Sequence, residues 1–247
     1  MWAEGTAAAI GRSIDIYYRD AARTAAMEAL LARFVGPGAL AFDIGAHLGD
    51  RSAAMARLGA RVVALEPQPA LHRALRALHR RTPGVEILGA AAGARAGRAE
   101  MFLNTRNPTV STLSGAFVAA AGDGPGWRGE VWDRRVRVPV IPLDALIARF
   151  GVPDFVKIDV EGHEAEVLAG LSRPLPALSF EITSLRVAAG LECLDRLAAL
   201  GEYAFALAVG EGHAFRPPGW MTDPAMRACV AGFGHADNSA DIYARRL

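Results

Sequence analysis

The sequence has few of the residues that would place a protein in a structural class at once. Its 247 residues include two cysteines, Cys193 and Cys229, which form no Cys-x-x-Cys pair, so neither a disulfide framework nor a zinc site is implied. No apolar run reaches the ~20 residues that a membrane-spanning helix needs. Residues 1–16 lack the long apolar core of a signal peptide. We therefore expect a cytoplasmic protein that does not contact a membrane.

The sequence also lacks an excess of charge of either sign. Lysine and arginine together number 27 against 26 acids, giving a net charge of +1, and Lys157 is the only lysine. This balance argues against general attraction to nucleic acid, and no basic patch with interleaved aromatic residues is visible. Hydrophobic residues make up 52% of the chain, which is enough for a large core. At this length we expect one α/β domain.

Apolar segments typical of buried strands alternate with segments that have helical spacing. In residues 20–34, apolar side chains recur at i, i+3, i+4 and i+7, as in an amphipathic helix. Apolar strands that alternate with such helices indicate a parallel sheet covered on both faces. The predicted fold class is therefore α/β, a doubly wound, Rossmann-like sheet of about seven strands. We predict strands over residues 40–44, 62–65, 85–88, 155–158, 177–182, 203–209 and 240–244, and helices over residues 20–34, 50–58, 70–80, 163–171 and 185–200.

The alternation of strands and helices stops after Gly93. Residues 98–103 and 135–141 have strand-like patterns, but a long polar and glycine-rich connection separates them. A connection of this length inside a compact domain is usually a lid or a binding loop, or is disordered. We predict an inserted hairpin with a long loop, and the sequence leaves open whether residues 121–129 close over a site.

The most informative segment is residues 41–50, AFDIGAHLGD. An apolar strand ends there in a turn bracketed by Gly45 and Gly49, and a helix begins near Asp50. Glycine allows close approach to the backbone, and a helix N-terminus offers free N–H groups. The next strand ends at Glu66, where a carboxylate accepts hydrogen bonds from the two hydroxyls of a ribose. Such turns also occur as plain connections between a strand and a helix. Together with Glu66, the pattern favours nucleoside binding.

A second segment, residues 154–164 with the sequence DFVKIDVEGHE, places several titratable groups after a buried strand. Asp159, Glu161 and His163 follow this strand, and ligands of open α/β sheets bind beyond the carboxyl ends of the strands. Such a group of side chains suits either acid–base chemistry or metal binding. His163 equally fits the first turn of a surface helix.

Four segments of the sequence together resemble the FkbM family of S-adenosylmethionine-dependent methyltransferases. They are residues 42–49 (FDIGAHLG), 65–67 (LEP), 141–146 (IPLDAL) and 156–162 (VKIDVEG). The last segment is the most selective, and the resemblance covers well over half of the chain. It implies a class I methyltransferase fold and methyl transfer mainly to hydroxyl oxygen, often on a sugar, a polysaccharide or a secondary metabolite. We assign residues 1–38 to an N-terminal helical segment and residues 39–247 to the methyltransferase domain.

By position, the resemblance implies that S-adenosylmethionine binds at the ends of the first strands. Glu66 would hold the ribose, with Pro67 packed beside it, and Ala90 and Ala91 would flank the adenine. Family members often carry a polar residue just after this point, and its absence leaves the adenine amino group without an assigned partner. His47 stands where family members often carry asparagine. The residues expected at the cofactor are Asp43, Gly45, Ala46, His47, Gly49, Glu66, Pro67, Ala90, Ala91 and Asp159.

Methyl transfer to a hydroxyl requires a group that removes the hydroxyl proton. We predict Asp159 as this base, with His163 as the second candidate and Glu161 beside them at the catalytic centre. Mg²⁺ held by Asp159 and Glu181 is a further possibility, because a metal lowers the pKa of a bound hydroxyl. Alternatively, Glu181 contacts only the acceptor.

The acceptor is expected to be a small molecule or a glycan rather than a nucleic acid. Small hydroxyl and amide side chains over residues 104–114 suit a polyol, and among them we predict contacts from Thr112 and Ser114. Glu181, at a strand end, and His235, in a late loop, are further predicted contacts.

Two other functional classes remain open from the sequence. An NAD(P)-dependent oxidoreductase would share the Rossmann-like sheet, but the sequence lacks both the Gly-x-Gly-x-x-Gly motif and a Tyr-x-x-x-Lys pair. A catalytically silent protein would bind a ligand or a partner without turnover. The intact acids Asp43, Glu66, Asp159 and Glu161 weigh against this second alternative.

Overall fold

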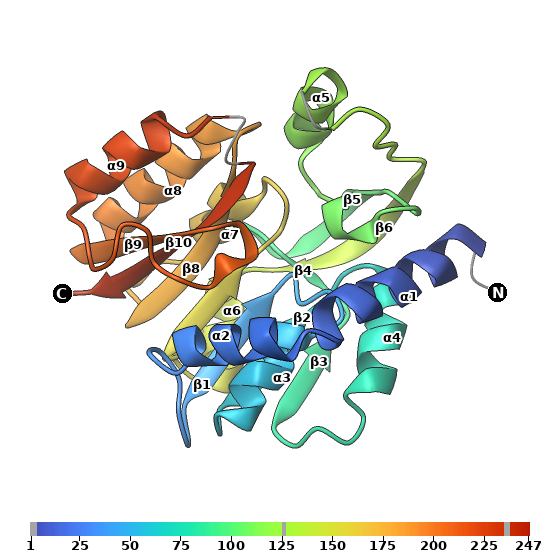
Figure 1. The fold of residues 1–247 in the computed structure, drawn as a ribbon, viewed down its shortest axis with the longest axis horizontal. Coiled ribbons are helices and arrows are strands. Elements are labelled where there is room, and N and C mark those ends of the chain that lie inside the picture. The colour runs from blue at the N-terminus through green and yellow to red at the C-terminus, as the bar shows by residue number, and fades with distance from the viewer. Residues whose placement is uncertain (1–3, 125–126, 235–237) are drawn as a thin grey trace.

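The centre of the molecule is a seven-stranded sheet with the strand order β3-β2-β1-β7-β8-β10-β9 (Figure 1). The computed structural model describes residues 4–124, 127–234 and 238–247. β10 pairs antiparallel with both of its neighbours, β8 and β9, and the remaining strand pairs of this sheet are parallel. The predicted doubly wound α/β sheet is thereby confirmed. Its strands are β1 (Leu40–Ile44), β2 (Arg61–Leu65), β3 (Val85–Leu88), β7 (Phe155–Ile158), β8 (Ala177–Thr183), β9 (Tyr203–Val209) and β10 (Ser239–Arg246).

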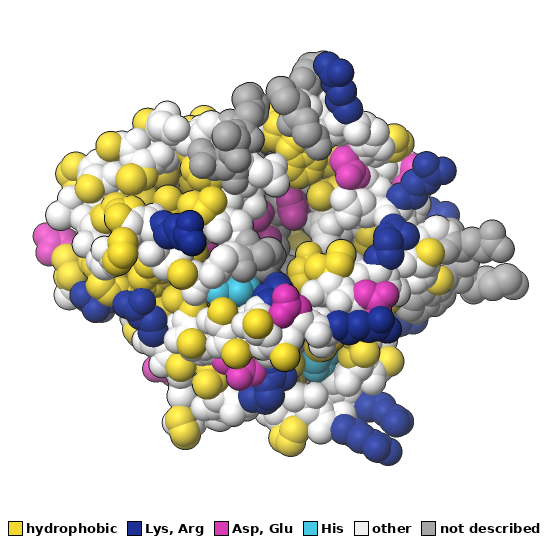
Figure 2. Space-filling model, in the orientation of Figure 1, with side chains coloured by type: hydrophobic (Ala, Val, Ile, Leu, Met, Phe, Trp, Pro, Cys, Tyr) yellow, Lys and Arg dark blue, Asp and Glu magenta, His cyan; other side chains and the backbone are white. Residues whose placement is uncertain are grey.

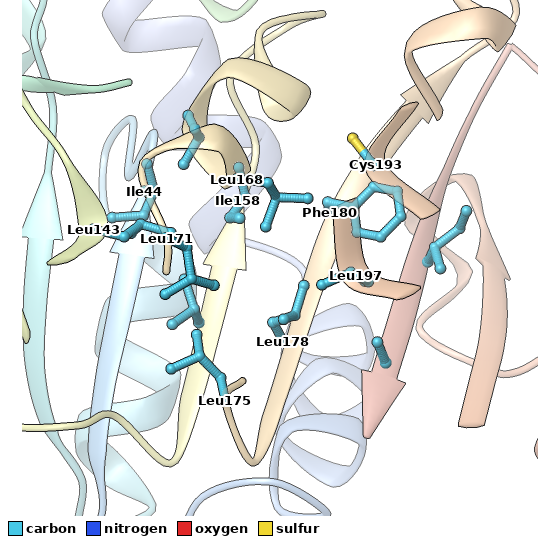
Figure 3. Close-up of a cluster of buried hydrophobic side chains, with 14 of the residues drawn as sticks. Ile44, Leu143, Ile158, Leu168, Leu171, Leu175, Leu178, Phe180, Cys193 and Leu197 are labelled. Carbon is cyan, nitrogen blue, oxygen red and sulfur yellow. The ribbon is translucent and has the colours of Figure 1, made fainter. Parts of the chain in front are cut away.

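The central strands are buried because both faces of the sheet are covered by helices. On one face, Ile44, Ile158 and Phe180 of three adjacent strands pack against Leu168 and Leu197 of the covering helices (Figure 3). The opposite face packs against α2 and α3. This two-sided burial explains why the strands read as apolar throughout. The helices of the first face are α6 (Leu143–Phe150), α7 (Glu164–Ala169), α8 (Val187–Leu200) and α9 (Asp223–Ala231); those of the second are α2 (Ala21–Leu31), α3 (Asp50–Arg57) and α4 (Pro69–Leu78).

A second, smaller sheet forms the insertion between β3 and α6. It has the strand order β4-β6-β5, and the antiparallel pairing of β5 with β6 confirms the predicted hairpin. In Figure 1, α5 stands apart from the helices that cover the main sheet. Residues 125–126, within the 121–129 segment, lie outside the described residues. The elements of the insertion are β4 (Ala91–Ala92), β5 (Gly97–Leu103), η1 (Pro108–Val110), α5 (Gly115–Asp123) and β6 (Arg134–Ile141).

The chain opens with two helices that lie across the front of the molecule in Figure 1. The helix predicted over residues 20–34 is α2, which begins after Asp20, whose side chain accepts a hydrogen bond from the backbone N–H of Arg23. Before it, α1 (Glu4–Tyr18) ends in Tyr18, whose hydroxyl donates to the carbonyl oxygen of Leu48 at 2.7 Å. This bond fixes the end of α1 beside the turn after β1. No helix within the described ranges is both long enough and apolar enough to cross a membrane.

The parallel strands β1, β2, β7 and β8 end at the same edge of the sheet, and β1 lies at the point where the chain direction across the sheet reverses. Two loops meet there closely. The backbone N–H of Asp159 donates to the carbonyl oxygen of Ile44 at 2.9 Å. Gly45 has a φ of +85°, and a Cβ on it would lie 1.8 Å from the carbonyl oxygen of Asp159. Only glycine therefore allows the two loops to approach this closely.

We expect the Gly45→Ala variant to be much less stable than the Gly38→Ala variant. Both glycines have a left-handed backbone, but Gly38 has open space where a Cβ would stand. Gly38→Ala should lower the free energy of unfolding by about 1–2 kcal/mol, the conformational cost alone. Gly45→Ala should lower it by more, because the β7 loop must also move. Urea denaturation measures both, and equal losses would contradict the close contact of the loops.

Candidate functional site

Two adjoining cavities lie beyond the carboxyl ends of the central parallel strands. The larger, which we call the acidic cavity, has a volume of about 350 Å³ and carries carboxylates from several elements. The smaller, which we call the narrow cavity, has a volume of about 50 Å³ and mostly apolar walls around Glu66. Figure 2 shows acidic side chains at the floor of a hollow between the part that carries α8 and α9 and the part that carries α5. The two cavities share Gly45, His47, Thr109, Asp159 and Glu161.

Backbone hydrogen bonds fix the turn after β1 against the end of β2. The N–H groups of Gly45 and Ala46 both donate to the carbonyl oxygen of Leu65, at 3.0 and 2.9 Å. His47, with a φ of +51°, turns its own N–H toward the side chain of Glu66. The turn is therefore held in a shape that presents its backbone to both cavities.

Glu66 is buried at the end of β2, and both of its carboxylate oxygens accept backbone hydrogen bonds. The donors are the N–H of His47 at 2.9 Å and the N–H of Gln68 at 2.8 Å. Burial raises the pKa of Glu66 to about 8, although these two bonds oppose the shift and the nearby Asp43 adds to it. Each oxygen retains a lone pair for a further donor, and the side chain lines the narrow cavity.

Asp43 and His47 extend the buried polar surface from the turn into the acidic cavity. Burial raises the pKa of Asp43 to about 6, against a hydrogen bond of 2.5 Å from the hydroxyl of Ser52. Burial lowers the pKa of His47 to about 4, so its imidazole is neutral at pH 7. The Nε2 atom of His47 is buried and has no hydrogen-bond partner among the described residues. Its ring packs edge-on against Tyr17 of α1, with ring centroids 5.5 Å apart.

The only lysine of the chain lies in the middle of the sheet, under the acidic cavity. The Nζ of Lys157 is 2.6 Å from Asp241 Oδ1 and 3.3 Å from Asp159 Oδ2. Burial lowers the pKa of Lys157, but the charges of Asp159 and Asp241 outweigh burial and hold the pKa above its ordinary value. The ammonium group therefore stays charged and links β7 to β10 across β8.

Asp159, Glu161 and Glu181 form a cluster of carboxylates in the acidic cavity. One oxygen from each lies within 4.8 Å of the others. Burial raises the pKa of both Glu161 and Glu181 well above the ordinary value, and the charge of Asp159 adds to this shift. The Oε2 atom of Glu181 is buried without a hydrogen-bond partner among the described residues. The cluster thus brings three carboxyl groups together, and among the described residues only Asp159 of the three has a cation beside it.

Hydrogen bonds from neighbouring residues hold the loop that carries Asp159 and Glu161. Glu161 has a φ of +57°, and its carbonyl oxygen accepts a bond of 2.7 Å from the hydroxyl of Thr112. The Oε1 of Glu164 accepts the N–H groups of Val160 and Gly162, at 3.0 and 3.2 Å. Burial raises the pKa of Glu164 to about 7. Glu164, at the start of α7, thus holds the loop through these two backbone hydrogen bonds.

The structure brings most of the predicted site residues to the two cavities. His163 lines the narrow cavity but not the acidic one, and burial lowers its pKa, with Glu166 opposing the shift. The predicted contact His235 lies outside the described residues. The predicted residues that line a cavity, besides His163, are Asp43, Gly45, Ala46, His47, Glu66, Pro67, Ala91, Asp159, Glu161 and Glu181.

Gly49 and Ala90 lie outside both linings. Gly49 caps the N-terminus of α3 with a φ of +82°, and a Cβ on it would meet Leu75 and His79 of the α4 region. Its place is thus explained by helix packing. Ala90 is buried just before Ala91, which does line the narrow cavity.

Thr112 and Ser114 are also absent from both linings, because their hydroxyls form hydrogen bonds with the protein backbone. Thr112 is fully buried and bonds to the carbonyl oxygen of Glu161. The Oγ of Ser114 accepts the N–H of Phe117 and so caps α5. From the same polar segment, Thr109 and Ser111 reach the cavities instead.

Several cavity residues were not identified from the sequence. Tyr17 of α1 and Thr183 at the end of β8 line the acidic cavity, and Gln68 lines the narrow one. For Thr183 a signal exists: it stands two residues after Glu181, so both side chains share one face of the strand. For Tyr17 there is none, because its position depends on how α1 crosses the sheet.

Residues 43–207 match the family model described as "Methyltransferase FkbM domain". No curated protein matches the chain.

The chain is similar to several solved structures. With an O-methyltransferase from Bacillus cereus in complex with SAH it shares 13% identity and a TM-score of 0.49, over 97% of this chain and 91% of that one. With precorrin-6y C5,15-methyltransferase from Geobacter metallireducens GS-15 it shares 14% identity and a TM-score of 0.46, over 91% of this chain and 87% of that one. With Aeropyrum pernix fibrillarin in complex with S-adenosyl-L-methionine it shares 12% identity and a TM-score of 0.46, over 85% of this chain and 68% of that one.

We expect Lys157→Met to lower the free energy of unfolding by about 3 kcal/mol or more, because it leaves Asp241 buried without its cation. The double variant Lys157→Met/Asp241→Asn should recover part of this loss. The exposed pair Arg149–Glu86, at 2.8 Å, provides the control, and Arg149→Met should cost less than about 1 kcal/mol. Urea denaturation measures all three, and a loss for Lys157→Met no larger than that of the control would contradict the interpretation.

Proposed function

The chain belongs to the FkbM methyltransferase family, and on that premise we propose that this S-adenosylmethionine-dependent methyltransferase acts on a hydroxyl group of a small-molecule or glycan acceptor. The observation that supports this most directly is that the narrow cavity, with the buried carboxylate of Glu66 in its wall, adjoins a larger cavity lined with carboxylates. Asp159 and Glu161 belong to both linings. In our proposal, residues 39–247 form the catalytic domain and residues 1–38 add Tyr17 to its acceptor side.

The described residues fit S-adenosylmethionine. Glu66 has free lone pairs for the ribose hydroxyls, and Pro67, Ala91 and Met101 provide apolar walls for the adenine. Gly45 lines both cavities, so the backbone of the turn is accessible to the methionine moiety. The buried Nε2 of His47 lacks a partner in the described chain and is free to bond to the cofactor. When bound, the cofactor supplies an electrophilic methyl carbon on a positively charged sulfur, which nearby carboxylates favour.

We assign the removal of the acceptor proton to Asp159. It lies in both linings, and its Oδ2 is 3.3 Å from Lys157 Nζ, so a carboxylate paired with a cation stands between the two cavities. The proton of the acceptor hydroxyl passes to this carboxylate while the hydroxyl oxygen forms its bond to the methyl carbon and the sulfur retains the bonding pair. Glu161, in the same loop, is the second candidate. His163 is less well placed, because it does not line the acidic cavity.

The acidic cavity suits an acceptor rich in hydroxyl groups. Thr109, Glu181 and Thr183 offer oxygen atoms as hydrogen-bond acceptors, and Trp127 adds an aromatic surface at the rim. These residues take the place of Thr112 and Ser114 as the proposed acceptor contacts. The excess of acids also disfavours acceptors that carry phosphate.

We expect the affinity for S-adenosylhomocysteine to rise with pH between pH 7 and pH 9, by up to about tenfold. The pKa of Glu66 is about 8, so the side chain is mostly protonated at pH 7 and ionised at pH 9. The ribose hydroxyls donate to the ionised form, so binding releases a proton. The other titratable groups that line the narrow cavity are His47, Asp159, Glu161 and His163. The pKa of His47 is about 4 and that of His163 is lowered by burial, whereas burial raises the pKa of Glu161 well above its ordinary value. A pH dependence that persists in the Glu66→Gln variant would therefore belong to Glu161.

Calorimetric titration in buffers of different ionisation heat measures both the affinity and the proton release. Glu66→Gln should bind weakly and without pH dependence, and NAD⁺ in a parallel cell should not bind. Saturable NAD⁺ binding would overturn the proposed cofactor site. A wild-type affinity that stays constant over this pH range would remove Glu66 from the ribose contact.

We expect Asp159→Asn to bind S-adenosylhomocysteine within about threefold of wild type but to lose at least about 100-fold in turnover, because the amide cannot accept the proton. Transfer of radiolabelled methyl groups to a panel of sugars and polyols measures the loss. The exposed Asp195 provides the control variant Asp195→Asn, which should keep full activity. Full activity of Asp159→Asn would exclude Asp159 as the base.

A further inference from the structure

We propose that Asp159, Glu161 and Glu181 together bind one divalent cation, Mg²⁺ or Mn²⁺, within the acidic cavity. This inference deepens the proposed function, because the cation would lie where the acceptor hydroxyl must be activated. It rests on four features of the described residues. These are the spacing of the carboxylate oxygens, the charge balance of the cavity, two buried oxygen atoms that have no hydrogen-bond partner, and the single face of β8 that carries both of these atoms.

The spacing of the carboxylate oxygens suits a single ion. One oxygen of each residue lies within 4.8 Å of the others. Ligands on opposite sides of an ion are about 4.2 Å apart at the bond length of Mg²⁺ and about 4.8 Å apart at that of Ca²⁺, and adjacent ligands are closer. The three oxygens can therefore converge on one ion without rearrangement of the backbone.

The charge of the cluster is only partly balanced by the protein. Lys157 contacts the cluster through Asp159, but its shorter contact is to Asp241. Arg51 also lines the cavity, where its Nη1 lies 3.7 Å from Asp50 Oδ2. Within the described ranges, neither Glu161 nor Glu181 forms an ion pair. Ionised carboxylates held this close repel one another, and either a bound proton or a cation between them relieves the repulsion.

Unpartnered oxygen atoms on β8 give independent support. The Oε2 of Glu181 and the Oγ1 of Thr183 are both buried without a hydrogen-bond partner in the described part of the chain. Thr183 is only 4% exposed, and its side chain lines the same cavity. Buried polar atoms are normally satisfied, and these two share one face of the strand. An ion with its bound waters would satisfy both, since Mg²⁺ and Mn²⁺ prefer oxygen ligands.

A cation at this place would assist the proposed reaction. It lowers the pKa of a hydroxyl that contacts it, so less basicity is required of the proton acceptor at neutral pH. Asp159 needs only one oxygen for the ion and keeps the other for the hydroxyl proton. The alkoxide oxygen then forms the bond to the methyl carbon as the carbon–sulfur bond breaks with its electron pair on sulfur.

Titration of the full-length chain with MnCl₂, followed by calorimetry and by the loss of the free Mn²⁺ signal in electron paramagnetic resonance, tests the site without any acceptor. We expect one Mn²⁺ per chain, displaced by excess Mg²⁺. Glu181→Gln should weaken Mn²⁺ binding at least tenfold while S-adenosylhomocysteine binding stays within about threefold, which shows that the variant is folded. The control is Glu166→Gln, an exposed acid on the neighbouring helix α7, which should bind Mn²⁺ like wild type.

The outcomes separate this proposal from the proposed function. If the wild type binds S-adenosylhomocysteine but no Mn²⁺, or if Glu181→Gln binds Mn²⁺ as tightly as wild type, the cation site is overturned and the methyltransferase function stands. Methyl transfer that is unaffected by MgCl₂ or by chelator would also overturn it, because the acceptor would then be activated without a cation. Mn²⁺ binding without S-adenosylhomocysteine binding would keep the cation site and remove the proposed function.

Discussion

The ion pair between Lys157 and the carboxylates of Asp241 and Asp159 is the interaction on which the site depends. It crosses three strands, since β8 lies between β7 and β10, and it places a full positive charge under the floor of the acidic cavity. Removing two charges from water costs several kcal/mol per ion, which close contact repays only when the geometry is good. Because the apolar packing of the sheet holds this geometry, the acids above it can remain close together.

The site combines a well-packed sheet with carboxyl groups whose ionised forms are disfavoured by burial. Burial raises the pKa of Asp43, Glu66, Glu161 and Glu181, so the ionised forms of all four are less stable in the free protein than in water. A ligand that donates hydrogen bonds, or one that is positively charged, reverses this penalty. The protein therefore favours a cationic cofactor without using basic residues to bind it.

The strands of the central sheet could be predicted well from the sequence. The hydrogen bonds and ion pairs between polar side chains could be predicted less completely. β1, β2, β7 and β8 are predominantly apolar, and their carboxyl ends place Asp43, Glu66, Asp159 and Glu181 at one edge by topology alone. In contrast, α5 has no clear apolar periodicity to mark it, and α9 has only the short spacing of Met226 and Val230, at i and i+4. The partner of Lys157 lies 84 residues further along the chain and is identified only when β10 is placed beside β8. Thr112 was assigned to the acceptor by its chemical type, but its hydroxyl is bonded to the backbone of Glu161.

The loop from Asp159 to Gly162 connects the two cavities, so the occupants of the two cavities affect each other. Its conformation is fixed by Glu164, by Thr112 and by the contact with Gly45, which leaves little freedom for its side chains to withdraw. In the proposed reaction, the cofactor loses its positive charge when the methyl group leaves. The carboxylates that favoured the sulfonium then no longer favour the product. The excess of acids that stabilises the charged cofactor thereby also promotes release of the neutral thioether, without any movement of the sheet.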